Sequence, residues 1–164
     1  MNKLAIWALG ALMTFAAPAF AAENPQDSQD LKALESANWY VPLNYGGFDF
    51  EIPAGSIVDK NSKLLAKYPD GSFGVSMENE AVQLEQKIAF EKARMYATQY
   101  KLVDPKVEKV TISGIKGAKA VGTLENHVVT VLILPVSDQQ LTTVIMATPD
   151  RKEWSDHFIE SLKH

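Results

Sequence analysis

Apolar and polar residues alternate along the segment that begins at Phe48, and this is the pattern of a half-buried strand. Phe48, Phe50 and Ile52 fall on one side of the segment, whereas Asp49 and Glu51 fall on the other. Successive side chains of a strand point to opposite faces of a sheet. The alternation therefore predicts a strand with its phenylalanines in the core and its carboxylates on the outer face.

A hairpin is predicted directly after this strand. Its first strand covers residues 63–68, its turn is Pro69-Asp70-Gly71, and its second strand covers residues 72–77. Proline presets φ at the first turn position and glycine accepts positive φ, so the turn chemistry fits a hairpin. Phe73, Val75 and Met77 alternate with small residues, which predicts one apolar face for the second strand.

The strongest helical pattern covers residues 80–101, which contain neither glycine nor proline. One stripe at helical spacing is predicted to face solvent, and it consists of Gln83, Lys87, Glu91, Arg94 and Thr98. The broad opposite side is apolar, with Leu84, Ile88 and Met95 on one flank and Val82, Ala89, Ala93, Tyr96 and Tyr100 on the other. A buried face of this width predicts a helix that lies across a sheet.

Four strands with hairpin-length connections are predicted next. They cover residues 107–113, 116–125, 128–136 and 141–148. The second of them carries Ala118, Ala120, Gly122 and Leu124 on one face, and small residues there would let a helix approach closely. The third is nearly continuously apolar and β-branched, which is typical of a central strand covered on both faces.

A second helix is predicted at the end of the chain. Thr148-Pro149-Asp150 supplies an N-cap, a proline at the first helical position and an acid in the first turn. Trp154, Phe158 and Leu162 recur every four residues and form one apolar stripe. The order of strands, long helix, strand meander and short helix predicts an α+β sandwich built on an antiparallel sheet.

The first residues read as an export signal. Met1-Asn2-Lys3 is positively charged, residues 4–17 are uncharged and apolar, and Ala19-Phe20-Ala21 has the small-x-small pattern of a cleavage site. The apolar run is shorter than the roughly 20 residues that span a bilayer, which favours a cleaved signal peptide over an anchor. Cleavage is predicted after Ala21 or Ala22.

The predicted organisation is therefore a signal peptide over residues 1–22, a flexible polar leader over 23–38 and a single domain over 39–164. No cysteine follows the apolar run, so a lipoprotein anchor is chemically impossible. We expect a soluble periplasmic or secreted protein with no stable membrane insertion after signal cleavage.

Composition narrows the classes of function. The 164 residues include no cysteine, which excludes disulfides, thiolate zinc sites and cysteine nucleophiles. The 16 basic and 20 acidic side chains give a net charge of -4, so the chain lacks the basic footprint of a nucleic-acid-binding protein. The Gly114-Ile115-Lys116-Gly117 segment has the GxxG form of KH domains, but its flanks read as strands and favour a hairpin turn.

The chain resembles the PsbP/DcrB-like family of small α/β sandwiches. The resemblance rests on the order of elements and on two phrases, FDFEIPAGS at 48–56 and VTISGIKGAKAVGT at 110–123, and it covers residues 45–163. It implies a non-enzymatic protein that works by binding or supporting partners, and it implies no catalytic residues. The chain departs from the lipoprotein members in having no cysteine for acylation, which favours a freely diffusing protein.

Candidate catalytic and metal-binding groups are sparse. Glu153, His157 and Glu160 share one helix face and could bind a metal weakly, but a short exposed helix commonly carries this mixture, so no metal or cofactor is predicted. No Gly-x-Ser-x-Gly elbow is present. Asp49 and Glu51 could support acid–base chemistry if buried together, although a solvated outer face is the simpler interpretation.

Three aromatic residues, Trp39, Tyr40 and Tyr45, precede the first predicted strand in a loop-rich stretch. They either line a groove for a ligand or partner or cover the core as a lid. The leading hypothesis is a non-catalytic binding or accessory protein of the cell envelope, whose partner is an unknown envelope protein or a small ligand. A structural or assembly factor differs from it only in the partner. The alternative is an exported hydrolase whose site is assembled from scattered residues such as Asp49, Glu51 and His127.

Overall fold

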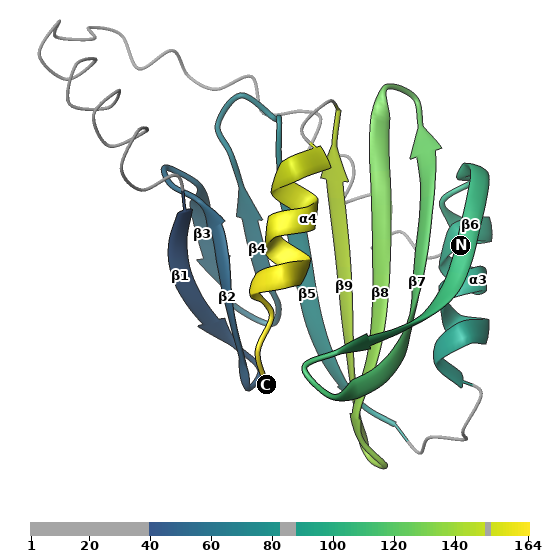
Figure 1. Ribbon diagram of the computed structural model, residues 1–164. Helices are drawn as coiled ribbons and strands as arrows, with labels where there is room; N and C mark the ends of the chain where they lie inside the picture. The colour runs from purple at the N-terminus through teal and green to yellow at the C-terminus, as the bar shows by residue number, and fades with distance from the viewer. Residues whose placement is uncertain (1–39, 83–87, 150–151) are drawn as a thin grey trace, which may run out of the picture.

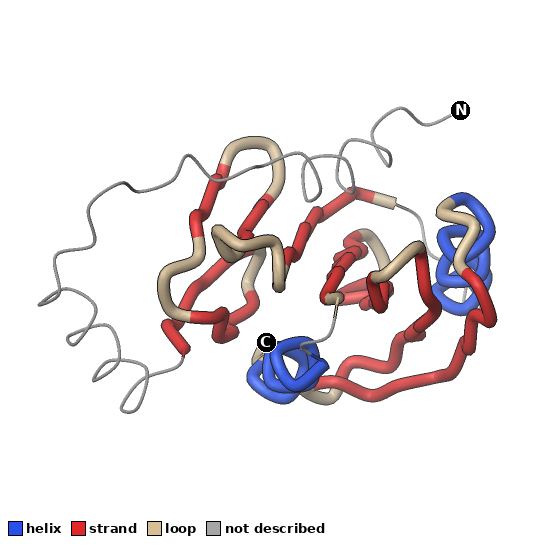
Figure 2. The backbone as a smooth tube through the Cα atoms, turned by 90° about the horizontal axis from the view of Figure 1, so that it is seen from above, coloured by secondary structure: helices blue, strands red, loops and turns tan. Residues whose placement is uncertain are grey.

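Antiparallel strands dominate residues 40–82, 88–149 and 152–164, the parts of the chain that the computed structural model describes. The predicted signal peptide, the predicted leader and Trp39 lie outside these described residues. In the described parts, two helices pack on the strands, and Figure 2 shows them well apart with strands between them. The α+β sandwich predicted from the order of elements is confirmed.

The main sheet has seven strands in the order β3-β4-β5-β9-β8-β7-β6, and every neighbouring pair is antiparallel (Figure 1). Its strands are β3 (Ile57–Lys60), β4 (Leu64–Lys67), β5 (Gly74–Ala81), β6 (Val103–Ile112), β7 (Ile115–Leu124), β8 (His127–Ser137) and β9 (Gln140–Thr148). A second sheet pairs β1 (Tyr40–Tyr45) with β2 (Phe48–Pro53). The helices are α3 (Ile88–Gln99) and α4 (Lys152–Ser161).

One face of the main sheet packs against α4 and β2, and we call the apolar cluster between them the α4-face core. Its largest members are Phe48, Phe50, Ile52, Leu64, Phe73, Met77, Leu132, Leu134, Trp154, Phe158 and Leu162. The period-two strand at Phe48, the hairpin over 63–77 and the apolar stripe of the last helix are thereby confirmed. Alternation and four-residue spacing predict these apolar faces because both patterns directly indicate which side of an element is buried.

The opposite face packs against α3, which lies across β6, β7 and β8, and we call this cluster the α3-face core. Ala93 and Ala97 of the helix meet the same cluster as Ala118 and Ala120 of β7, and all four are buried. A Cβ atom on Gly122 would stand 2.8 Å from the Cβ of Leu102. The small residues predicted on one face of this strand therefore allow α3 and Leu102, which follows the helix, to approach the strand closely.

The strand β8 is covered on both faces, as its continuous apolar sequence predicted. Val129, Val131 and Ile133 belong to the α3-face core, whereas Leu132 and Leu134 belong to the α4-face core. It pairs with β7 on one side and with β9 on the other. Central position and two-sided burial explain why polar residues are nearly absent from it.

The helix predicted over residues 80–101 was wrong at its start. Glu80 and Ala81 end β5, where they pair with Leu141 and Gln140 of β9. Residues 83–87 lie outside the described part, and the described helix begins at Ile88. Glu and Ala are strong helix formers, but intrinsic propensity is a small energy per residue, and ladder pairing with the central strand β9 outweighs it here.

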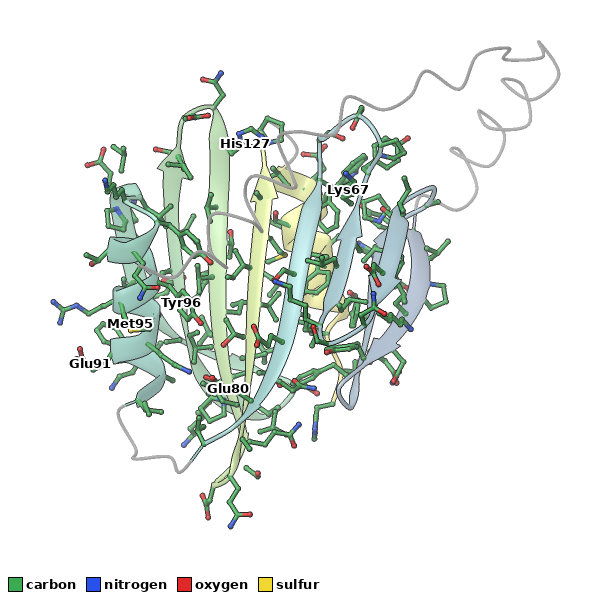
Figure 3. The ribbon with its side chains drawn as sticks, turned by 180° about the vertical axis from the view of Figure 1, so that it is seen from behind. Lys67, Glu80, Glu91, Met95, Tyr96 and His127 are labelled. Carbon is green, nitrogen blue, oxygen red and sulfur yellow. The ribbon has the colours of Figure 1, made fainter. Side chains whose placement is uncertain are left out.

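The helix α3 ends without a glycine. The amide of Leu102 donates to the carbonyl of Ala97 at 3.0 Å, the amide of Lys101 donates to Thr98 at 3.1 Å, and Lys101 has φ 53°. This left-handed C-cap turns the chain into β6. Met95, predicted on the buried side of the helix, is 42% exposed and lies on the outward side of α3 (Figure 3).

Two strands were not predicted from the sequence. Residues 40–45, interpreted as a loop-rich stretch, form β1 and pair with β2 from Tyr40–Pro53 to Tyr45–Phe48. The other is β3, an edge strand whose residues are all exposed. Neither strand shows a clean apolar alternation, and β1 is defined by its pairing with β2.

In the described residues, no helix is long and apolar enough to cross a membrane.

Candidate functional site

An aromatic ring, an imidazole and a carboxylate meet where β1 and β2 face α4. The rings of Tyr40 and His157 are stacked, with centroids 3.5 Å apart and planes inclined by 8°. His157 Nε2 lies 2.6 Å from Oε2 of Glu51, and in the tautomer that carries its hydrogen on Nε2 the imidazole donates a hydrogen bond to the carboxylate. Residues from β1, β2 and α4 are thus joined in one contact, which we call the Tyr40–His157–Glu51 cluster.

The surroundings of Tyr40 in this cluster disfavour the ionised form of its hydroxyl. Burial raises the pKa of Tyr40 above its ordinary value, and the carboxylates of Glu153 and Glu51 raise that pKa further. The backbone amide of Glu51 also donates to Oγ of Ser161 at 2.9 Å. Two hydrogen bonds therefore join α4 to β2, one between His157 and the Glu51 carboxylate and one between Ser161 and the Glu51 amide. The Tyr40 hydroxyl is protonated at neutral pH and can donate a hydrogen bond.

The predicted aromatic surface is only partly within the described residues, since Trp39 lies outside them. Tyr40 and Tyr45 are partly buried and pack against the α4-face core. The hydroxyl of Tyr45 donates to the backbone carbonyl of Ser62 at 3.4 Å. These contacts support the role of a lid on the core, and a partner contact at these tyrosines stays a prediction.

The side chains considered for metal binding and hydrolysis are not gathered in one place. Among the described residues, no three His, Asp or Glu side chains are grouped so that they could hold a metal ion, and His157 instead contacts Glu51. Oδ1 of Asp49 accepts a hydrogen bond from Nδ2 of Asn44 at 2.7 Å. His127 begins β8, and within the described parts its buried Nδ1 has no hydrogen-bond partner. No contact described in the structure joins His127 to Asp49 or Glu51.

The Gly114-Ile115-Lys116-Gly117 segment belongs to the tight connection between β6 and β7. Ser113 and Gly114 have φ of 51° and 79°, and Ile112 pairs with Ile115 across the turn. Two successive residues with positive φ are the requirement of a type I′ hairpin turn. The hairpin interpretation of this segment is confirmed, and the likeness to a KH loop is excluded by its strand flanks.

A groove of 1020 Å³ opens between the first turn of α3 and the β6–β7 hairpin, and sequence reasoning missed it. Apolar lining comes from Ile88, Ala89 and Phe90 of α3 and from Pro135 of β8. Polar lining includes Lys109 of β6, Lys116 of β7, Glu91 of α3 and Asp138 of the β8–β9 turn. We call this feature the α3 groove.

The α3 groove exists because different parts of the β6–β7 hairpin pack against different cores. Near the turn, Val110, Ile112 and Ile115 pack against the α4-face core. Farther along β7, Ala118 and Ala120 pack in the α3-face core. The turn end of the hairpin therefore bends away from the helix (Figure 1), and the space beside the first turn of α3 is left open.

Two lysines stand side by side in this groove. Lys109 is paired in register with Ala118, and Lys116 is paired with Thr111, so the two lysines are diagonal neighbours on one face of the hairpin. Within the described residues, neither ammonium group has an ion-pair or hydrogen-bond partner, whereas the nearby Lys119 contacts Glu108 at 2.8 Å. A signal was available in the sequence, because alternation along both strands places the two lysines on one face.

The comparisons with known proteins give likenesses of fold. No protein-family model matches the chain, and no curated protein matches it. A Bacteroides thetaiotaomicron protein is similar at 12% identity and a TM-score of 0.42, over 71% of this chain and 44% of its own. The chain thus spans less than half of that protein.

A second solved structure is LpqN of Mycobacterium tuberculosis, described as involved in cell envelope biogenesis. It is similar at 10% identity and a TM-score of 0.45, over 76% of this chain and 89% of its own. At these identities and TM-scores, neither likeness carries an argument about what this chain does.

Proposed function

We propose that the chain is an exported, non-catalytic binding or accessory protein of the bacterial cell envelope, and that it holds its ligand in the α3 groove. The observation that carries the proposal is the groove itself. Its volume of 1020 Å³ is at the top of the range of about 300–1,000 Å³ that small-molecule sites occupy. Its lining combines an apolar surface with a few charged groups, which is the usual make-up of such sites.

Export is supported by the charged start, the short apolar run and the Ala19-Phe20-Ala21 pattern of the first residues. The absence of a catalytic role is supported by the lack of a nucleophile elbow in the sequence. Both carboxylates that the hydrolase alternative requires have other contacts, since Glu51 contacts His157 and Asp49 contacts Asn44, and no described contact joins either of them to His127. No observation favours that alternative.

The PsbP/DcrB-like relationship is part of the proposal. FDFEIPAGS forms β2 and the turn after it, and VTISGIKGAKAVGT spans the β6–β7 hairpin. The order of strands, helix, meander and helix also agrees with that family resemblance. A binding role without catalysis is what the resemblance implies.

The test is native mass spectrometry. The full chain is expressed in a bacterium, and its product, with whatever processing the cell carries out, is purified gently from the cell envelope. We expect an added small-molecule mass on the wild-type protein. Ala89→Trp places a large side chain in the groove and should remove this mass, whereas Thr98→Trp, on the exposed side of the same helix, should keep it.

A second variant guards against misfolding of the first. Ile88→Gln makes the groove wall polar without adding bulk, and thermal unfolding followed by circular dichroism shows whether each variant is folded. Bound mass that survives both folded groove variants would contradict the proposal. A wild-type protein that carries no added mass and takes none from an envelope extract would contradict it as well.

A further inference from the structure

We propose that the α3 groove binds an amphiphile with an anionic head, which Lys109 and Lys116 hold while the apolar tail lies against Ile88, Ala89 and Phe90. This inference rests on the proposed function, because it names the class of ligand for the same groove.

The lysine pair supplies the reason for the anion. Lys109 and Lys116 are diagonal neighbours on one face of the hairpin, and within the described residues neither has a partner of opposite charge. Two neighbouring ammonium groups repel each other, and an anion between them relieves this repulsion and accepts hydrogen bonds from both. The pairing of Lys119 with Glu108 shows that a lysine of the same hairpin can be neutralised by the chain where a carboxylate is provided.

The acidic groups of the groove do not compensate this charge. Glu91 lines the groove, but its side chain is 66% exposed and its carboxylate lies 3.8 Å from the guanidinium of Arg94 (Figure 3 shows its place on α3). Asp138 is exposed in the turn between β8 and β9. Neither carboxylate forms an ion pair with the two lysines among the described contacts, so the cationic character of the hairpin wall is retained.

The apolar wall supplies the reason for the tail. Ile88, Ala89 and Phe90 are half-buried and line the groove together with Pro135. A free phosphate or carboxylate would use the lysines and leave this wall in water. An alkyl tail covers it, and each methylene that leaves water strengthens binding about threefold to fourfold. The groove therefore fits a molecule with both parts better than it fits either part alone.

The test is isothermal titration calorimetry on the processed full-length product with three probes, each below its micelle concentration. The probes are monododecyl phosphate, inorganic phosphate and dodecyl maltoside, which present head and tail, head alone, and tail with a neutral head. We expect the tightest binding for monododecyl phosphate, about tenfold or more tighter than for dodecyl maltoside at low salt. Added salt should reduce this difference, because the lysines are solvent-accessible.

The double variant Lys109→Gln/Lys116→Gln should weaken monododecyl phosphate about tenfold and leave dodecyl maltoside unchanged. The matched control is Lys106→Gln, which removes the same charge from the same strand but does not line the groove. Lys106, Lys109 and Lys116 are all exposed, so these variants should fold like the wild type.

The outcomes separate the two proposals. The two dodecyl probes could bind equally tightly, with no effect of the double variant but with loss of binding in Ala89→Trp or Ile88→Gln. This result would overturn the proposed preference for an anionic head and would leave the proposed ligand groove standing. Inorganic phosphate that binds as tightly as monododecyl phosphate overturns the tail. Dodecyl binding that is insensitive to both groove variants, or absent altogether, overturns the amphiphile, and the native mass measurement then decides the proposed function independently.

Discussion

His157 of α4 and Glu51 of β2 are 106 positions apart in the chain, and their side chains meet at 2.6 Å. The contact joins the small two-stranded sheet to the last helix on the outer side of the α4-face core. The Tyr40 ring stacked on His157 extends it to β1. Figure 1 shows β1, β2 and α4, the three elements that this group of residues joins, on the side of the described structure away from α3.

The first prediction concerns the energy of that contact. Replacement of Glu51 by alanine should lower the free energy of unfolding by about 0.5–1 kcal/mol, because both partners are partly exposed, at 46% for Glu51 and 32% for His157. His157→Ala should cost about 1 kcal/mol more, since the stack with Tyr40 is lost as well. Urea unfolding of both single variants and the double variant measures the coupling, with Glu160→Ala as an exposed control on the same helix. A coupling of zero would refute the stabilising role.

The second prediction concerns the small residues under α3. Ala120→Leu should destabilise the protein by about 1–3 kcal/mol, because the buried strand face has no room for a larger side chain beneath Ala93 and Ala97. The matched control is Thr123→Leu on the exposed side of the same strand, which should change stability little. Urea midpoints report both effects. Equal midpoints for the two variants would mean that close approach of the helix does not depend on small side chains.

The third prediction concerns alkaline pH. Burial raises the pKa of Tyr100 well above its ordinary value, and the neighbouring Tyr96 and Glu78 raise it further. Above about pH 10 the unfolded chain therefore loses this proton while the folded chain keeps it, so stability should fall as pH rises from there. Below that pH, both states are protonated and Tyr100 contributes no pH dependence.

Tyr100→Phe isolates this effect. The variant should show a shallower loss of stability above about pH 10 than the wild type, while the slopes near neutral pH should agree. Tyr96, whose ring stacks on Tyr100 at 5.9 Å and whose pKa burial also raises, should contribute in the same direction. Urea unfolding at a series of pH values measures the slopes. Identical alkaline slopes for wild type and Tyr96→Phe/Tyr100→Phe would contradict the burial argument.

The fourth prediction concerns export. The full chain expressed in a bacterium should be recovered from the periplasm or medium with the mass of a product that begins at Ala22 or Glu23. Ala19→Leu/Ala21→Leu should block cleavage, because the peptidase requires small residues at these positions, whereas Ala17→Leu in the apolar run should not. Intact mass measurement decides between the forms. An unprocessed wild-type chain would rule out the cleaved signal.

Most of the sheet could be predicted because its strands bury one face. Phe48, Phe50 and Ile52 alternate with polar residues, and Trp154, Phe158 and Leu162 recur at helical spacing, so the buried side is written in the local pattern. The stretch from Tyr40 to Tyr45 has no such pattern. It becomes a strand because β2 offers it hydrogen bonds, and no local signal reports a partner elsewhere in the chain.

The same distinction applies to the candidate sites. The sequence identified His157 and Glu51 as separate chemical groups and placed each on the correct element, but not in contact with each other. Alternation along β6 and β7 places Lys109 and Lys116 on one face of the hairpin, but neither this lysine pair nor the groove beside it was predicted from the sequence. A groove depends on where a neighbouring element stops making contact, and that follows from how the β6–β7 hairpin divides between two cores.

The sequence by itself determined the export pattern, the lack of cysteine chemistry, the class of fold and the faces that α4, β2, β7 and β8 bury. Only the tertiary structure decided the end of β5, the pairing of β1, the Tyr40–His157–Glu51 cluster and the α3 groove. The physical reason is the separation along the chain between the residues that determine each feature. Burial of a face is recorded residue by residue in the spacing of apolar side chains, whereas strand partners and gaps between elements depend on chain segments that meet only after folding.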